Sequence, residues 1–241
     1  MPYSEFFTKG QFETLPETLA VQERRTTLVL GIPKEVTMVE NRVAIVPNSV
    51  RVLVASGFRV LLESGAGDKS NFSDHAYSEA GAEICHDKKT VFQANILVKV
   101  APPTLEELDW MAMDQVLISP LHLPIINENY IEKLLSKRIT AFAMEYLQSS
   151  DGSFPIVRIM SEIAGISVML TAGELLKSHS GGRGLLLGGI SGVPPAKVVI
   201  LGAGVVAEYA VKTALGLGCS VRIFDNDIST IIRLQTNVGH H

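Results

Sequence analysis

The chain has 241 residues, 46% of them hydrophobic, and a formal net charge of −4 at pH 7. That length and apolar content can bury the core of one large domain or two modest ones, and we expect two. The mildly acidic balance excludes the basic surface typical of proteins that bind nucleic acid, so no nucleic-acid partner is expected. The two cysteines, Cys85 and Cys219, have neither metal-ligand nor disulfide-framework spacing. This predicts no metal site and suits a reducing, cytoplasmic compartment.

Residues 1–26 mix acidic and basic side chains and contain no apolar run of the kind found in signal peptides. We interpret them as a polar N-terminal extension, either a solvated tail or an arm that contacts another subunit. No uninterrupted apolar run farther along the chain reaches membrane-spanning length. The protein is therefore expected to be soluble, with no membrane partner.

Residues 27–152 show an alternation of short apolar runs and helical periodicity. Strands are predicted at 28–31, 59–62, 96–100, 116–119 and 140–142, and helices at 48–56, 74–80 and 126–136. Gly57 and Gly81 stand where helix C-caps are expected. This alternation predicts an α/β fold built on a doubly wound parallel sheet, and we assign 27–152 to a substrate (catalytic) domain.

Residues 153–241 are predicted to form a second Rossmann-like domain that binds the cofactor. A long helix at 160–178, with apolar residues at helical spacing, is expected to join the two domains. The glycine-rich loop at 181–195 follows it. This loop is either a flexible connector or a segment that packs beside the cofactor cleft.

The segment 197–225 has the order strand, glycine-rich turn, helix and second strand that bound dinucleotides require. Gly202 permits the tight turn, Gly204 lets the backbone approach the pyrophosphate, and Ala207 allows the helix to pack closely on the strand. The pyrophosphate would lie at the helix N-terminus. Asp225 ends the second strand, where a carboxylate accepts hydrogen bonds from the ribose and repels a 2′-phosphate. The pattern favours NAD over NADP.

Three polar residues stand out in the first half of the chain. Arg42 lies in a turn-like segment from which its guanidinium could bind a substrate carboxylate, although such an arginine is more often a surface residue. Lys99 lies in an apolar run, so its ammonium needs a partner, a function or a path to solvent. His122 follows a predicted strand at the edge where open α/β sheets bind ligands, and a histidine suits proton transfer near neutral pH. A lone histidine is more often structural.

Several separated motifs fall in the order of one known family. The chain resembles the alanine dehydrogenase and pyridine nucleotide transhydrogenase family, and more closely its alanine dehydrogenases. The motifs are GIPKE at 31–35, ENRVAIVP at 40–47, LVKV at 97–100, LHL at 121–123, MSEIAG at 160–165, GGRG at 181–184, GVPPAK at 192–197 and the nucleotide-binding segment.

The resemblance implies specific roles for the matching residues. Arg42 would hold the substrate carboxylate, Lys99 would contact the carboxylate and the reacting centre, and His122 would be the general acid/base. The cofactor NAD would be bound by a larger set: Ser161, Gly202, Gly204, Val206, Ala207 and Asp225.

The reaction implied is reversible, NAD-dependent oxidative deamination of L-alanine to pyruvate and ammonium, in a cytoplasmic homo-oligomer. Three alternatives stay open. The chain could be the NAD(H)-binding part of a proton-translocating transhydrogenase, which requires membrane partners. It could be a related saccharopine-type dehydrogenase, or a non-catalytic cofactor-binding fragment.

The chain also departs from the family pattern. Ala207 replaces the more common third glycine, Ile190-Ser191 replaces Val-Pro, and Thr230 stands where relatives often have a basic residue. After Asp225 only one helical segment, 228–238, remains. A full dinucleotide-binding sheet has a second half, so we expect an incomplete second domain with an uncovered apolar sheet edge.

Overall fold

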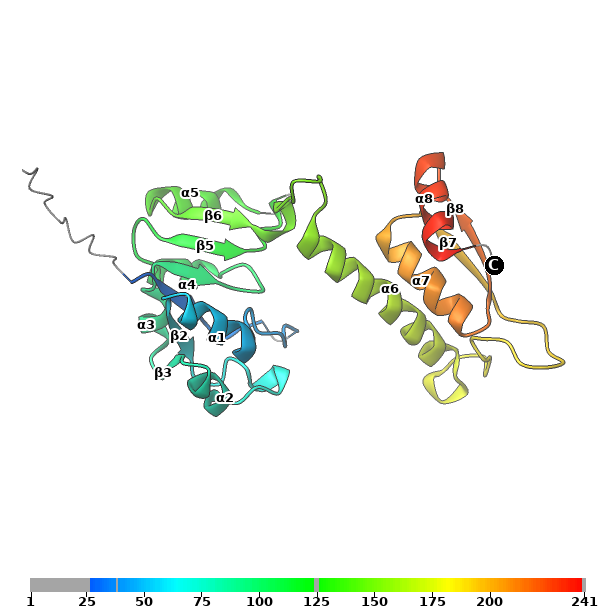
Figure 1. The fold of residues 1–241 in the computed structure, drawn as a ribbon, viewed down its shortest axis with the longest axis horizontal. Coiled ribbons are helices and arrows are strands. Elements are labelled where there is room, and N and C mark those ends of the chain that lie inside the picture. The colour runs from blue at the N-terminus through cyan, green and yellow to red at the C-terminus, as the bar shows by residue number, and fades with distance from the viewer. Residues whose placement is uncertain (1–26, 38, 124–125, 240–241) are drawn as a thin grey trace, which may run out of the picture.

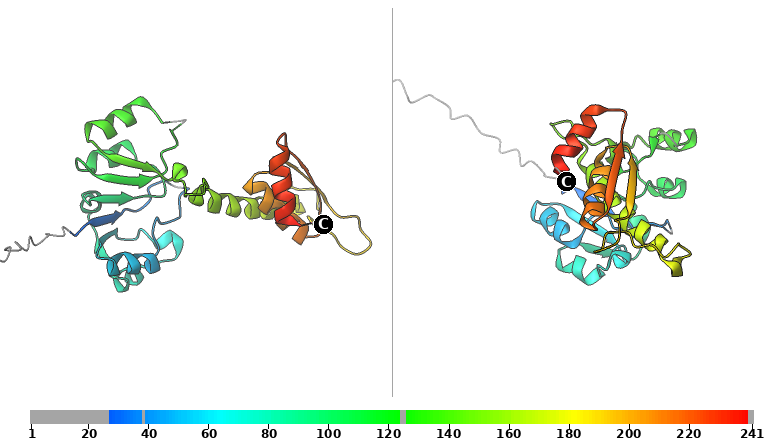
Figure 2. Two further views of the ribbon diagram at one scale, coloured as in Figure 1. Left: turned by 45° about the horizontal axis from the view of Figure 1, so that its top comes forward. Right: turned by 90° about the vertical axis from the view of Figure 1, so that its right-hand side faces the viewer.

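The structure is a computed structural model, and it describes residues 27–239 except 38 and 124–125. The predicted extension at 1–26 therefore lies outside the described residues. Figure 1 shows two α/β parts connected by the long helix α6, Pro155–Leu176. The views in Figure 2 show the same arrangement from two further directions.

The first part is a six-stranded sheet in the order β3-β2-β1-β4-β5-β6, and every pairing is parallel. Its strands are β1 Val29–Ile32, β2 Arg59–Glu63, β3 Glu83–Cys85, β4 Ile96–Val98, β5 Val116–Ser119 and β6 Thr140–Ala143. The chain moves outward from β1 to β3 and then returns to the other side of β1 with β4. The order therefore reverses between β1 and β4, and ligands bind at such a point, beyond the carboxyl ends of the strands.

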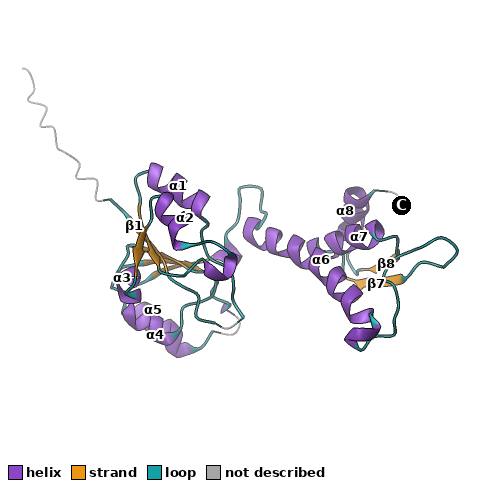
Figure 3. Ribbon diagram, turned by 90° about the horizontal axis from the view of Figure 1, so that it is seen from below, coloured by secondary structure: helices purple, strands orange, loops and turns teal. Residues whose placement is uncertain are grey.

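Helices cover both faces of this sheet, as Figure 3 shows. On one face Val50 and Tyr77 pack against Leu30 and Ile32, and on the other Leu108 and Leu134 pack against strand residues that include Leu97. The helices are α1 Pro47–Ala55, α2 Asp74–Glu79, α3 Lys88–Phe92, α4 Leu105–Trp110 and α5 Glu128–Ser136. The central strands β1, β2 and β4 are largely buried, which explains their nearly continuous apolar sequence, whereas the edge strands β3 and β6 are partly exposed. The predicted α/β doubly wound class is confirmed.

The second part contains two parallel strands, β7 Lys197–Leu201 and β8 Ser220–Phe224, with α7 Val205–Gly216 between them and α8 Ile228–Val238 after them. One face of the strand pair packs on α7 and α8, where Ile200, Val221 and Ile223 are partly buried. The opposite face is open: Leu201 is 82% exposed and Val199 60% exposed. An uncovered apolar sheet edge was predicted, and the exposed apolar residues Val199 and Leu201 lie on a face of the strand pair.

Sequence patterns missed or shifted several elements. The short elements β3, α3 and α4, of three to six residues, were not predicted, because elements of this length carry little periodicity. The long helix was predicted at 160–178 but starts five residues earlier, where Pro155 occupies the first helical turn, and ends at Leu176. β4 ends at Val98, so Lys99 follows the strand. Gly57 and Gly81 have φ of 92° and 95°, as helix-ending glycines require.

Helix α6 is long and apolar enough to cross a membrane by length and composition alone, with 11% of the relevant window buried. It is not an uninterrupted apolar run, because Arg158, Glu162 and Glu174 lie within it, so the prediction that no such run reaches membrane-spanning length is not contradicted. In the structure α6 packs along α7, and Gly165 lies where the two helices approach most closely. A Cβ on Gly165 would be 2.4 Å from the Val206 carbonyl oxygen and 2.7 Å from Tyr209 Cβ.

We expect Gly165→Ala to lower the free energy of unfolding by about 1–3 kcal/mol, because the added methyl group must separate α6 from the α7 backbone. Gly173→Ala on the same helix is the matched control. A Cβ at Gly173 meets nothing nearer than 3.7 Å, so this change should stabilise the helix by about 0.5–1 kcal/mol. Urea unfolding of both variants measures the difference. Equal stability of the two would contradict the close helix approach.

Candidate active site

A cleft of 540 Å³ lies between the carboxyl edge of the six-stranded sheet and the start of α6 and α7. Its walls come from the segments that follow β1, β4, β5 and β6. Its polar lining is Glu40, Arg42, His122, Glu145 and Ser161, and its apolar lining is Ala44, Val100, Ala101, Pro102, Pro120, Met144, Ile156, Val157, Met160, Ala164 and Val206. The cleft therefore occupies the switch point that the strand order defines.

Arg42 is held in the cleft wall by its near neighbour Glu40. Glu40 Oε1 accepts from Arg42 Nε at 2.8 Å and Oε2 accepts from Nη2 at 2.7 Å, a two-point pairing of guanidinium and carboxylate. The segment itself is anchored, because Lys69 Nζ donates to the Glu40 carbonyl and Ser70 Oγ to the Asn41 carbonyl. The hydrogen bond from Arg42 lowers the pKa of Glu40. Arg42 Nη1 faces Met160 Sδ at 3.1 Å, so its remaining donors are directed toward α6.

His122 has a left-handed backbone, with φ of 52°, which is unusual for a residue other than glycine. Glu145, after β6, stabilises this conformation: its Oε1 accepts from the His122 amide at 2.7 Å and from the Leu121 amide at 3.0 Å. Burial alone would raise the pKa of the Glu145 carboxyl, but backbone hydrogen bonds, including those from His122 and Leu121, outweigh it and lower the pKa. Glu145 thus remains ionised at neutral pH and fixes the backbone from which the His122 imidazole projects.

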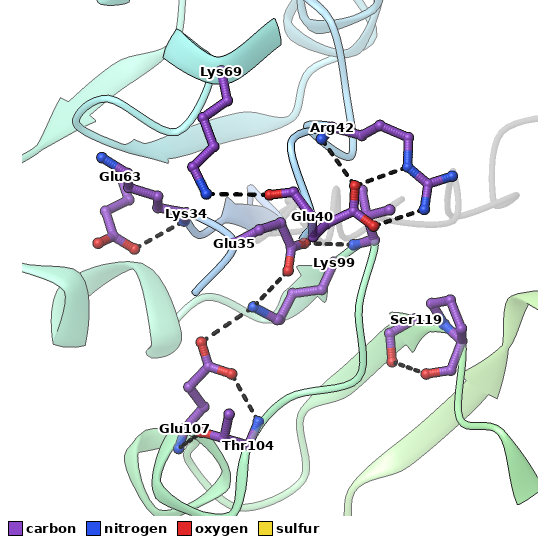
Figure 4. A network of polar contacts seen from close by, with 12 residues as sticks. Lys34, Glu35, Glu40, Arg42, Glu63, Lys69, Lys99, Thr104, Glu107 and Ser119 are labelled. Atoms are coloured by element: carbon purple, nitrogen blue, oxygen red, sulfur yellow. Dashed lines mark hydrogen bonds and ion pairs between the residues drawn. The ribbon is translucent and has the colours of Figure 1, made fainter. Parts of the chain in front are cut away.

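Lys99 does not line the cleft. Its side chain is 1% exposed, and its Nζ lies 3.1 Å from Glu107 Oε1 and 3.2 Å from Glu35 Oε2, as Figure 4 shows. The expectation that a lysine in this apolar run needs a partner is met by two carboxylates. The contact of Lys99 with substrate that the resemblance implied stays a prediction, because Lys99 does not line this cleft and its ammonium already pairs with Glu35 and Glu107.

A second cleft of 520 Å³ runs beside the glycine-rich turn. Ser161, Gly202, Gly204, Val206 and Ala207 line it, together with apolar residues of α6, β7 and α7. Ser161 and Val206 line the first cleft as well, so the two spaces adjoin.

The glycine turn fits a dinucleotide. Gly202 has φ of 99°, and a Cβ at Gly202 or Gly204 would have no neighbour within 4 Å, so the backbone is open to a ligand. Gly204 caps the N-terminus of the 12-residue α7 without a side-chain partner for its free amides, which suits a pyrophosphate. Asp225 lines neither cleft. Its Oδ2 accepts from the Ala203 amide at 2.5 Å and its Oδ1 from the Asp227 amide at 2.8 Å, so it supports the turn from the end of β8.

The structure therefore brings Arg42, His122, Ser161 and the glycine turn together and leaves Lys99 outside. Sequence reasoning missed two acidic partners, Glu40 and Glu145. Glu40 stands two residues before Arg42 within a recognised motif. Glu145 could have been found because it follows a predicted strand of the same parallel sheet, so its position at the carboxyl edge was implied.

The doubly wound sheet, its switch-point cleft and the adjoining glycine turn define an α/β protein of the dinucleotide-binding type. Comparison with known families agrees: the model described as "Alanine dehydrogenase/PNT, N-terminal domain" matches residues 31–164, and the corresponding C-terminal domain model matches 168–241. The chain belongs to the alanine dehydrogenase/PNT family. The two matches meet inside α6, whereas the predicted division at 152/153 precedes that helix.

Individual relatives give the same result. The chain is 42% identical to an alanine dehydrogenase of Methanococcus maripaludis over 214 residues and 40% identical to that of Bacillus subtilis over 213. Each alignment covers 88% of this chain, but 57% and 56% of the relative, so the chain spans a little over half their length.

Solved structures of two kinds are similar to the chain. An L-alanine dehydrogenase superposes with a TM-score of 0.83 at 40% identity, covering 88% of this chain and 58% of that one. A transhydrogenase from Sinorhizobium meliloti superposes with a TM-score of 0.76 at 28% identity, covering 87% and 62%.

Proposed function

We propose that the protein catalyses reversible oxidative deamination of L-alanine, in which L-alanine, NAD⁺ and water give pyruvate, ammonium, NADH and a proton. The observation that carries the proposal is the shared wall of the two clefts. Arg42 and His122 line one cleft, the glycine turn lines the other, and Ser161 and Val206 line both. A small substrate in the first cleft and a dinucleotide in the second would therefore meet beside Ser161 and Val206.

Each residue then has a role that its geometry supports. Arg42 binds the substrate carboxylate with the guanidinium donors that Glu40 leaves free. His122 takes up and returns protons as water adds to the imino carbon and ammonium leaves. Glu145 fixes the His122 backbone. The apolar walls exclude water from the reacting carbon, which strengthens the electrostatic contacts there.

The cofactor would be held by the residues of the second cleft. Gly202 and Gly204 admit the pyrophosphate to the start of α7, where Val206 and Ala207 line its path, and Ser161 contacts it from α6. Asp225 accepts from the ribose hydroxyls with the lone pairs that its two backbone partners leave free. Bound NAD supplies the hydride acceptor, and the protein's own contribution is alignment.

A transhydrogenase component is the second candidate, and the similarity to the Sinorhizobium meliloti protein favours it. NADH oxidation separates the two. We expect the protein to oxidise NADH when pyruvate and ammonium are both present, and to leave NADH unchanged with an NADP⁺ analogue as acceptor. Acceptance of the hydride by the analogue alone would favour a transhydrogenase. NADH binding without turnover on either acceptor would favour a non-catalytic cofactor-binding chain.

We expect Asp225→Asn to raise the ratio of NADPH to NADH affinity by about tenfold, because the amide still accepts from the Ala203 amide but no longer repels a 2′-phosphate. Asp227→Asn is the matched control. It removes a carboxylate two residues away, one that caps α8 by accepting from the Ser229 amide. Fluorescence titration with each nucleotide gives the ratio, and an unchanged ratio in Asp225→Asn would remove this residue from the cofactor site.

The assembly as a homo-oligomer, the cytoplasmic location and the division into domains at 152/153 stay predictions. The absence of a membrane partner is also a prediction, and it holds only if the protein is an alanine dehydrogenase and not a transhydrogenase component. A mass measurement in solution tests whether the protein is a homo-oligomer.

A further inference from the structure

The carboxylates that flank Lys99 are themselves buried. Glu35 and Glu107 side chains are 4% and 3% exposed, and the Lys99 Nζ between them donates to Glu107 Oε1 and forms an ion pair with Glu35 Oε2. Glu35 follows β1, Lys99 follows β4, and Glu107 belongs to α4. Three buried charges from three separate segments are a demanding arrangement, because a buried charge left without a partner is strongly unfavourable. Each carboxylate therefore depends on Lys99 for its partner charge, and Lys99 depends on both carboxylates.

Each carboxylate uses its other oxygen to bind a backbone amide in the segment that follows Lys99. Glu35 Oε1 accepts from the Val100 amide at 2.6 Å, and Glu107 Oε2 accepts from the Thr104 amide at 2.8 Å. These amides are the two ends of the segment 100–104. The ammonium of Lys99 thus connects, through two carboxylates, both ends of one short stretch of backbone (Figure 4).

The segment 100–104 is a wall of the substrate cleft, since Val100, Ala101 and Pro102 all line it. It contains two consecutive prolines, Pro102 and Pro103, which have no amide hydrogen to donate. The two anchored amides therefore hold the ends of the segment. The buried side chain of Pro103 and the hydrogen bonds that Thr104 accepts from α4 amides attach it as well.

We propose that Lys99, Glu35 and Glu107 form a buried ionic clamp that positions the cleft wall 100–104, and that Lys99 is a positioning residue which does not touch the substrate. The expected effect of the clamp on KM and kcat rests on the proposed function. Its expected effect on the backbone of segment 100–104 does not depend on that function. The clamp fixes the surface against which the substrate packs opposite Met160 and Ala164 of α6.

Two variants of the full chain test the clamp. Lys99→Met removes the ammonium and leaves two buried carboxylates. Glu107→Gln is the milder change, since it keeps Lys99 and the side-chain shape and weakens only the link to Lys99 and Thr104. Lys212→Met is the matched control, because Lys212 pairs with the buried Glu208 on α7, away from the segment 100–104.

Amide hydrogen exchange is the first measurement. We expect the Val100 and Thr104 amides, the two in segment 100–104 that the clamp binds, to exchange about tenfold faster in the clamp variants. The amides of α7 should keep their protection, and the control should match the unaltered protein. Unchanged exchange at 100–104 in a folded Glu107→Gln protein would overturn the clamp, whatever the activity. This result is independent of the proposed reaction.

Kinetics with pyruvate, ammonium and NADH are the second measurement. A displaced wall should raise the KM for pyruvate by about tenfold in Glu107→Gln and lower kcat by a smaller factor, since His122 and Arg42 are intact. If Lys99→Met instead abolishes kcat while exchange at 100–104 stays normal, Lys99 contacts the reacting atoms and the clamp is wrong. If the unaltered protein shows no turnover, the proposed function fails and the exchange result alone decides the clamp.

Discussion

Replacing His122 with glutamine is expected to lower kcat for pyruvate amination by about 10²–10⁴-fold, because the amide cannot accept and return protons. The affinity for NADH should remain unchanged, since His122 lines the cleft of Arg42 and not that of the glycine turn. The backbone should also keep its place, because Glu145 binds the His122 amide and not its imidazole. Steady-state kinetics and NADH titration of the same sample separate the two effects.

The control for this change is His75→Gln. His75 lies on α2 with its side chain 81% exposed, where it pairs with Glu79. It should lose no activity. If His122→Gln retains the activity of the unaltered protein, the general acid/base is another group.

Replacing Arg42 with lysine is expected to raise the KM for pyruvate by about tenfold or more, which corresponds to the roughly 1.5–3 kcal/mol of a hydrogen bond to a charged group. A lysine keeps the positive charge but loses the planar set of donors that can bind Glu40 and a substrate carboxylate at the same time. We expect kcat to fall as well, because a carboxylate bound at one point leaves the reacting carbon free to rotate away from the cofactor.

Arg59→Lys is the matched control for Arg42. Arg59, at the start of β2, also forms a two-point pairing with a carboxylate, that of Glu83 at the start of β3, but both side chains are half exposed and neither lines the cleft. Its replacement should leave KM and kcat unchanged. Equal kinetic effects of the two substitutions would show that the loss at Arg42 is structural and not a loss of substrate binding.

The glycine turn and the order of the sheet were predictable from sequence for physical reasons. Gly202 has a φ of 99° that favours glycine, and Gly204 leaves the start of α7 open to a ligand, so their spacing carries direct structural information. The short central strands are mostly buried and therefore appear as apolar runs. Their alternation with helices predicted one parallel sheet. The site at the carboxyl edge followed, and with it the association of Arg42 and His122.

Lys99 shows what the sequence left undetermined. Its place in an apolar run indicated correctly that the ammonium needs a partner, but the partners, Glu35 and Glu107, are 64 positions before it in one case and 8 after it in the other. Neither separation corresponds to a helix or strand repeat. Only the tertiary packing of the segment after β1 against α4 decides whether the lysine faces the cleft or the core. A family motif aligns Lys99 with a residue of its relatives but does not determine which way its side chain faces.

Glu145 was missed for a related reason. Its carboxylate binds the amides of Leu121 and His122. Every residue except proline has such an amide, so the residue types do not reveal the pairing. The strand ends could have indicated that Glu145 lies near His122, but not that its carboxylate binds the His122 amide, whose residue has a left-handed conformation. Contacts between side chain and backbone of this kind come from structure.

The proposed reaction transfers the nitrogen of ammonium to L-alanine, and the most direct measurement follows that nitrogen. Isotopically labelled ammonium is supplied with pyruvate and NADH, and the product is analysed by NMR. We expect labelled L-alanine in an amount equal to the NADH consumed, and none with His122→Gln. NADH consumption without labelled alanine, or labelled alanine of equal yield from the His122 variant, would contradict the proposed reaction.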